Sequence, residues 1–309
     1  MTAYPSNQSP EYYRLYPRPT YLMIWKEPKS YSGRRLNFRN KTTSTSNTLS
    51  RNSALKMKKA ISWLVASATK KKVFEKKFGR LVSWRINFIT LTLPTQHGLD
   101  DRKVKRIFNE FCKWARYNHG LNNYVWKAEI QKRGELHLHI ISDCYIHHSN
   151  IRFKWNQLCA RYGLLNGHTN PNSTDVHAVI DEGVKNLTAY CIDYMQKKGK
   201  DENGEDIRLI KGRLWGCSKA LSNAGKNYMP LDEHEAENVH KAFVRANWEP
   251  RQIERTSTYI YCVSRGKNPY DFIRKDDEIH NIYTKELQLI RSQNFQLTLF
   301  ERQALMTAT

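Results

Sequence analysis

The stretch NYVWKAEIQKRGELHLHIIS, residues 123–142, decides the fold. Apolar and polar residues alternate through 123–131 and again through 136–142, which is typical of half-buried strands. The loop Lys132–Arg133–Gly134 between them has glycine where a three-residue hairpin loop needs a left-handed residue. The stretch therefore predicts a β-hairpin, and a tight hairpin requires antiparallel strands.

Strands and helices are interleaved on both sides of this hairpin. Residues 85–93, RINFITLTL, alternate and are rich in β-branched residues, which predicts a strand. Residues 100–119 carry apolar side chains at helical spacing after an aspartate suited to capping. Similar patterns predict helices at 53–78, 150–162, 182–198 and 231–247, and strands at 21–25, 174–180, 207–215 and 257–264. We expect an α+β fold, an antiparallel sheet with helices packed on one face.

Positive charge is concentrated near the N-terminus. The 309 residues carry a net charge of +22, and residues 1–80 hold 18 bases and 3 acids, a net 18 − 3 = +15. Such a charge favours a polyphosphate partner, meaning nucleic acid or an anionic membrane face. We expect a polar, partly flexible segment, a basic amphipathic helix, a core domain and a C-terminal part of the same domain with a DNA-contacting hairpin and helices, over 1–50, 51–80, 81–200 and 201–309.

Several classes of protein are excluded by missing patterns. No apolar run approaches the ~18 residues of a membrane-spanning helix. The sequence contains neither a phosphate-binding G-x-x-x-x-G-K-[ST] loop nor G-x-G-x-x-G, so we expect no nucleotide cofactor. The six cysteines are scattered without a C-x-x-C pair, which indicates reduced thiols in a cytosol.

The hairpin carries the first candidate site. His137 and His139 lie two apart on a strand, so their side chains share one face of the sheet. With a three-residue loop, Glu129 pairs with His137 and joins that face. Two imidazoles and one carboxylate form an open site for Mg²⁺, Mn²⁺ or another first-row ion. The alternative is a half-buried histidine pair with ordinary hydrogen bonds.

The second candidate site is Tyr190-x-x-x-Tyr194-x-x-Lys197, whose side chains share one helix face. A tyrosine oxygen can attack a phosphodiester and form a covalent phosphotyrosine. A metal ion and a lysine would offset the weak nucleophilicity of a phenol. A second tyrosine would start a second transfer, which suits an enzyme that cuts and rejoins strands. The alternative is an amphipathic helix that uses tyrosine as half-core.

In order, FITLT (residues 88–92), E-x4-G-x2-H-x-H and Y-x3-Y-x2-K resemble the motifs of the HUH endonucleases. Within them, residues 85–200 resemble the two-tyrosine rolling-circle replication initiators of single-stranded DNA bacteriophages, the microvirus type. The resemblance implies a ferredoxin- or RRM-like antiparallel sheet. It also implies a metal-binding histidine pair with a third ligand, alternating nucleophiles and a helper lysine, at His137, His139, Glu129, Tyr190, Tyr194 and Lys197.

Cations and an aromatic residue also gather in GRLWGCSKAL, residues 212–221, where bases of a single strand would stack. The alternative is a core tryptophan near a basic surface. We expect DNA contacts from Lys211, Arg213, Trp215, Lys219, Arg34 and Arg35.

Together these features predict an enzyme that nicks single-stranded origin DNA through a 5′-phosphotyrosine and rejoins it in rolling-circle replication of a phage. We expect it to act in the cytoplasm of the bacterial host, with a host helicase and polymerase. Three alternatives remain: a plasmid relaxase or transposase, a non-catalytic single-strand-binding protein, and a basic packaging protein.

Overall fold

The computed structural model divides the chain into two compact units, which are described separately. The larger unit comprises Thr43–Asn223 and Gln288–Thr309, and the smaller unit comprises Met1–Thr42 and Ala224–Leu287. The structure describes residues 13–26, 47–75, 79–93, 100–131, 134–165, 167–180, 186–196, 208–253, 258–262, 270, 273–274 and 277–306.

An antiparallel sheet forms the centre of the larger unit, with the strand order β3-β4-β6-β5-β8. The long strand β4 pairs along one edge with β3 and then with β7, and along its other edge with β6. The strands are β3 Lys71–Glu75, β4 Arg80–Thr92, β5 Tyr124–Ile130, β6 Leu136–Ser142, β7 Thr174–Ile180 and β8 Trp215–Cys217. The expected α+β class and antiparallel sheet are confirmed.

The hairpin between β5 and β6 has the predicted register. The amide of Gln131 donates to the carbonyl of Glu135 at 2.9 Å, and Glu129 lies opposite His137. Gly134 has φ +91°, a conformation that side chains with a Cβ rarely adopt. The loop glycine thus sets which residues of the two strands face each other.

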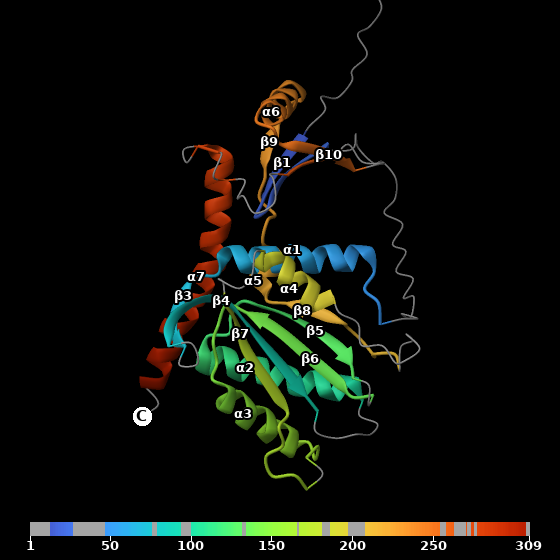
Figure 1. Cartoon of the computed structure of the whole chain (residues 1–309), viewed down its shortest axis with the longest axis vertical. Coiled ribbons are helices and arrows are strands. Elements are labelled where there is room, and N and C mark those ends of the chain that lie inside the picture. The colour runs from blue at the N-terminus through green and yellow to red at the C-terminus, as the bar shows by residue number, and fades with distance from the viewer. Residues whose placement is uncertain are drawn as a thin grey trace, which may run out of the picture. The chain divides into compact units, whose positions relative to one another are not determined.

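Two helices cover one face of this sheet, α2 Asp101–His119 and α3 His148–Arg161 (Figure 1). Asp100 caps α2 by accepting from the amide of Arg102, and Gly120 ends it in the left-handed conformation. The core between helices and sheet is fully apolar at its centre, with Leu91, Leu138, Ile140, Phe111 and Trp155 all buried. Burial of this face is the main stabilising contribution.

Helices also cover the opposite face, whereas the sequence predicted helices on one face. They are α1 Arg51–Ser67, α4 Leu187–Gln196 and α5 Lys219–Asn223, with α1 in contact with α4, α5 and β5 (Figure 1). The apolar side of α4 is buried at Leu187, Cys191 and Met195. Phe88 is 1% exposed on the sheet face beneath α4. Apolar groups on both faces of β4 therefore require cover on both sides.

The basic helix expected over 51–80 is wrong in its second half. α1 ends at Ser67, where Ala68 takes an extended conformation, and Lys71–Glu75 forms β3 on the edge of β4. Pairing with an open strand edge satisfies backbone groups that a lysine-rich helix end would leave to water. The strand expected at 207–215 is also absent from its described part, because β8 begins only at Trp215. Side chains hold residues 208–211 instead, as described below.

The smaller unit has its own antiparallel sheet, in the order β10-β11-β2-β1-β9. Its elements are β1 Tyr13–Arg18, β2 Tyr21–Lys26, β9 Met229–Leu231, α6 Glu233–Arg245, β10 Glu249–Ile253 and β11 Thr258–Cys262. The helix α7 Glu278–Met306 begins in this unit and continues in the larger one. This division differs from the predicted boundaries, which assigned 201–309 to the core domain. The reason is that β2 pairs with β11 across more than two hundred residues of chain.

None of the helices in the described part of the chain is long and apolar enough to span a membrane.

Candidate active site

The candidate site lies on the sheet face beneath α4. Side chains of alternate residues point to one face of a strand, so the register places charged, aromatic and hydroxyl groups side by side. Lys127 lies opposite His139, His139 opposite Thr90, and Thr90 opposite Asp175. The next row contains Glu129, His137 and Thr92. Four strands thus supply one polar surface.

The carboxylate of Glu129 connects two of these strands. Its Oε2 atom lies 3.2 Å from Nε2 of His139 and 3.8 Å from Nζ of Lys127. Burial alone would raise the pKa of Glu129, but the hydrogen bond from His139 and the charge of Lys127 outweigh it and lower the pKa. Glu129 is therefore an ionised acceptor at neutral pH.

His137 is the neutral partner in this group. Burial, followed by its neighbour His139, lowers its pKa to about 4. Its Nε2 atom is buried and has no hydrogen-bond partner among the described residues. The ring centroids of His137 and His139 are 5.9 Å apart. A buried imidazole nitrogen that is unprotonated and unpaired is suited to accept a ligand.

The structure does not gather these groups into a finished metal centre. Among the described residues, no group of three or more His, Cys, Asp and Glu side chains is placed so that it could hold a metal ion. Their donor chemistry still fits a divalent ion, because two imidazoles and one carboxylate suit first-row metals. The unpaired nitrogen of His137 is the structural observation in favour of that fit.

Tyr194 reaches the histidine pair from α4. Its hydroxyl lies 3.3 Å from Nδ1 of His139 and 3.4 Å from Oγ1 of Thr90. Thr90 in turn lies 3.2 Å from the same nitrogen of His139. Burial raises the pKa of Tyr194, and the nearby carboxyl of Asp175 adds to this, while Thr90 opposes it. The Tyr194 hydroxyl therefore keeps its proton at neutral pH.

Tyr190 occupies the same side of α4 but a different environment. Its side chain is 41% exposed, and its ring packs edge-on to Phe88 at a centroid distance of 5.8 Å. The ring of Tyr194 lies closer to Phe88, at 4.4 Å. The structure therefore brings Tyr194, Glu129, His137 and His139 together and leaves Tyr190 at the rim. Lys197, Arg34 and Arg35 lie outside the described residues.

Sequence reasoning missed a histidine beside the tyrosines. His177 stacks on Phe88 with a centroid distance of 5.1 Å and an interplanar angle of 4°. Its ring lies 6.3 Å from that of Tyr194, and its Nδ1 lies 3.6 Å from Asp175. The spacing Asp175-x-His177 on a predicted strand is the signal that placed both side chains on one face. Lys127 and Thr90 were missed in the same way.

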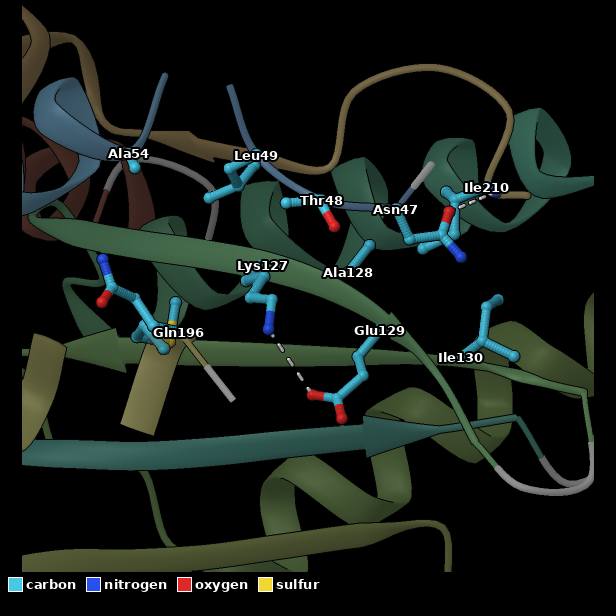
Figure 2. A pocket seen from close by; sticks show the side chains of 11 residues that line it. Asn47, Thr48, Leu49, Ala54, Lys127, Ala128, Glu129, Ile130, Gln196 and Ile210 are labelled. Atoms are coloured by element: carbon cyan, nitrogen blue, oxygen red, sulfur yellow. Dashed lines mark hydrogen bonds and ion pairs between the residues drawn. The ribbon is translucent and has the colours of Figure 1, made fainter. Parts of the chain in front are cut away.

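A cavity of about 180 Å³ adjoins Glu129 and Lys127. Figure 2 shows both side chains between the strands and the segment that contains Asn47. The Asn47 amide donates to the carbonyl of Arg208 and accepts from the amide of Ile210, which closes one wall. The remaining lining includes Thr48, Leu49, Ala54, Met195 and Gln196.

The residues expected to contact DNA are only partly brought to this site. Trp215 lies opposite Lys127 on β8, and its indole donates to Ser53 of α1 at 2.6 Å. It is a packed, half-buried residue. The charged side chains are exposed and do not converge on the histidines: Lys211, Arg213 and Lys219.

Comparison with known proteins places the site in a recognised region. Residues 86–199 match the family model of the replication-associated protein ORF2. The matched region runs from β4 through α4 and includes all of the histidines, the glutamate and the tyrosines discussed above. No curated protein and no solved structure matches the chain. The family match supports a rolling-circle replication initiator.

Proposed function

We propose that this chain is an endonuclease and strand transferase that nicks single-stranded origin DNA through a 5′-phosphotyrosine and later rejoins the strand. The observation that carries the proposal is the chain of contacts from Tyr194 through His139 to Glu129, within a region that matches a replication-associated family. A hydroxyl nucleophile, an imidazole and a carboxylate in sequence are suited to phosphodiester chemistry. The initiator would serve rolling-circle replication of a single-stranded DNA phage.

In the nicking step, the Tyr194 oxygen forms a bond to the phosphorus of the scissile phosphodiester, and the bond from phosphorus to the 3′ oxygen breaks. The phenol loses one proton and the departing 3′ oxygen gains one, so charge is conserved. His139 and Thr90 are within hydrogen-bond distance of the phenolic oxygen and would orient it. Phe88 would hold the ring against the sheet.

A divalent ion, Mg²⁺ or Mn²⁺, would be held by His137, His139 and Glu129. When bound, it would neutralise charge on the scissile phosphate and polarise a phosphoryl oxygen. The low pKa of His137 keeps that imidazole unprotonated for such a role. Lys197 stays a predicted helper that would steady the phosphate.

Rejoining would reverse the first step. A free 3′ hydroxyl attacks the phosphotyrosine, the bond from phosphorus to the tyrosine oxygen breaks, and the phosphodiester is restored without a nucleotide cofactor. Tyr190, one helical turn from Tyr194, would take a second strand while the first remains attached. Its exposed position at the rim suits a group that waits for a later substrate.

The chain would act with partners that supply the remaining reactions. The net charge of +22 favours binding of the phosphate backbone, with release of counterions. Strand separation and synthesis would require a host helicase and polymerase in the bacterial cytoplasm. A plasmid relaxase or transposase would share this chemistry and differ in its target.

The test is a covalent-adduct assay on denaturing gels. Labelled single-stranded oligonucleotides that include the element's own origin are incubated with the full chain and Mn²⁺. We expect a metal-dependent protein–DNA adduct that Tyr190→Phe/Tyr194→Phe loses. Tight binding without an adduct would overturn the proposal in favour of a non-catalytic binding protein.

A further inference from the structure

We propose that the smaller unit binds single-stranded DNA on the sheet face that carries Arg14, Trp25 and Tyr228. This site is separate from the histidines and tyrosines of the larger unit. The choice of DNA as the ligand rests on the proposed function, whereas the site itself rests on the packing of the smaller unit.

The two central strands of the smaller unit bury only one of their faces. Leu15, Leu22 and Ile24 are at most 2% exposed and point to the same side. The opposite side carries Arg14 paired with Trp25, and Tyr16 paired with Met23, and these four are only half-buried. An aromatic and basic sheet face that stays accessible needs a role other than core formation.

Cations and aromatic rings alternate across this face. The guanidinium of Arg14 lies 4.5 Å from the ring centroid of Tyr228 and 5.8 Å from that of Trp25. The rings of Tyr16 and Tyr228 are 5.4 Å apart, and the guanidinium of Arg18 lies 5.0 Å from Tyr16. Each cation is within the ~6 Å range of a cation–π interaction. We name these five residues the stacking platform.

One end of the stacking platform is closed and the other is accessible. Arg18 is 7% exposed, donates to the carbonyl of Gly225, and its own carbonyl accepts from Tyr270. At the other end Tyr228 is 37% exposed, and Arg14 and Trp25 are half-buried. The buried end fixes the geometry, and the accessible end presents rings and a guanidinium to a ligand.

The charge around the stacking platform selects an anionic ligand. β1 and β2 contain two arginines and one lysine and no acidic residue. The acidic residues Glu233, Glu235 and Glu237 lie on α6 instead. A ligand with flat π-faces and regularly spaced negative charge matches this surface, and single-stranded DNA has both. Duplex DNA hides its base faces within the stack, so stacking favours the single strand.

The test measures the affinity of the full chain for an oligothymidylate of about 20 nucleotides, longer than the ~4–16 nucleotides that one single-strand-binding fold covers. Fluorescence anisotropy is recorded for the wild type, Trp25→Ala, Tyr228→Ala and Trp25→Phe. We expect each alanine variant to bind about tenfold more weakly, because each loses one stacking surface. Trp25→Phe keeps a ring and should bind within about threefold of the wild type.

Phe153→Ala is the matched control, because Phe153 is 70% exposed on α3 of the larger unit and lies outside the stacking platform. Unchanged affinity in Tyr228→Ala and Trp25→Ala would overturn the proposal, as would an equal loss in Phe153→Ala. Circular dichroism of each variant separates loss of binding from loss of folding, and exposed Tyr228 is the variant least able to unfold the unit.

Adduct formation on a short origin oligonucleotide is measured in parallel. Loss of the adduct in the wild type with platform-dependent binding retained would refute the nicking function alone. A normal adduct together with affinity that is indifferent to the stacking platform would refute this inference alone.

Discussion

The phenolic oxygen of Tyr194 lies 3.3 Å from Nδ1 of His139, although 55 residues separate the two in the chain. The other nitrogen of the same imidazole contacts Glu129 at 3.2 Å. His139 therefore connects a hydroxyl on α4 with a carboxylate on β5, and the sheet register holds both connections. An arrangement that needs three elements in register is sensitive to single substitutions, which makes the site testable.

His137→Ala should abolish adduct formation with little loss of DNA binding. We expect the rate to fall by more than about 100-fold, since loss of even an outer-sphere partner costs a metal site ~10–100-fold. The rate is measured on denaturing gels and the affinity by anisotropy. A parallel fall in rate and affinity would show that the histidine pair is structural.

The two tyrosines should contribute unequally to the first nick. Tyr194→Phe removes the hydroxyl that contacts His139, whereas Tyr190→Phe removes a hydroxyl at the exposed rim. We expect Tyr194→Phe to lose most of the first-turnover adduct and Tyr190→Phe a smaller share. Single-turnover gels with each variant measure this. The reverse ranking would contradict the assignment of Tyr194 as first nucleophile.

Asp101→Ala should destabilise the larger unit. Asp101 is 1% exposed and accepts from both terminal nitrogens of Arg208, at 3.0 and 2.9 Å, and from the amide of Lys211. Arg208 also donates to the carbonyl of Gly134 in the β5–β6 loop. We expect a loss of roughly 2 kcal/mol in the free energy of unfolding by urea, because buried donors lose their acceptor.

Arg161→Ala is the control for this prediction. It removes the ion pair between Arg161 and Glu110, in which the arginine is 59% exposed. We expect a change below about 1 kcal/mol, as for exposed pairs in general. Equal effects of Asp101→Ala and Arg161→Ala would refute a stabilising role for the buried carboxylate.

His137 should make the metal-free chain less stable in acid. Its pKa is about 4 in the folded chain, below the ordinary value of 6.5. Between these two pH values the unfolded state binds a proton that the folded state does not, so stability is lost as pH falls from 6.5 toward 4.

The size of this effect is at most about 3 kcal/mol, since one pKa unit corresponds to ~1.4 kcal/mol and His137 is only half-buried. It is measured as the difference in unfolding free energy between wild type and His137→Gln, in chelator, across that window. His148→Gln, which removes an exposed imidazole, is the control. A wild-type advantage that does not shrink in acid would contradict the burial of His137.

Local patterns predicted the parts of the fold that depend on neighbouring residues. Gly134 and the alternation around it specify the pairing of Glu129 with His137, because loop length sets hairpin register. Asp100 and Gly120 mark the ends of α2 as the sequence indicates. The side chain of Tyr194 lies over the sheet because Cys191 and Met195 bury the adjacent face of the same helix.

Contacts across long stretches of chain were not predictable in this way. β10, with the sequence EPRQI, lacks alternation and contains a proline, yet it pairs with β11 as an edge strand. β3 forms because an edge of β4 is open to it, which no pattern within Lys71–Glu75 reveals. His177 lacks a paired histidine in sequence, and only the pairing of β7 with β4 places it on Phe88.

The most direct test of the central claim identifies the residue that carries DNA. The adduct formed with origin oligonucleotide and Mn²⁺ is digested with nuclease and protease, and the peptides are analysed by mass spectrometry. The account predicts a nucleotide attached through its 5′ phosphate to Tyr194 in the first turnover, with Tyr190 modified when a second strand is supplied. A nucleotide on any other residue, or cleaved DNA without a covalent peptide, would contradict it.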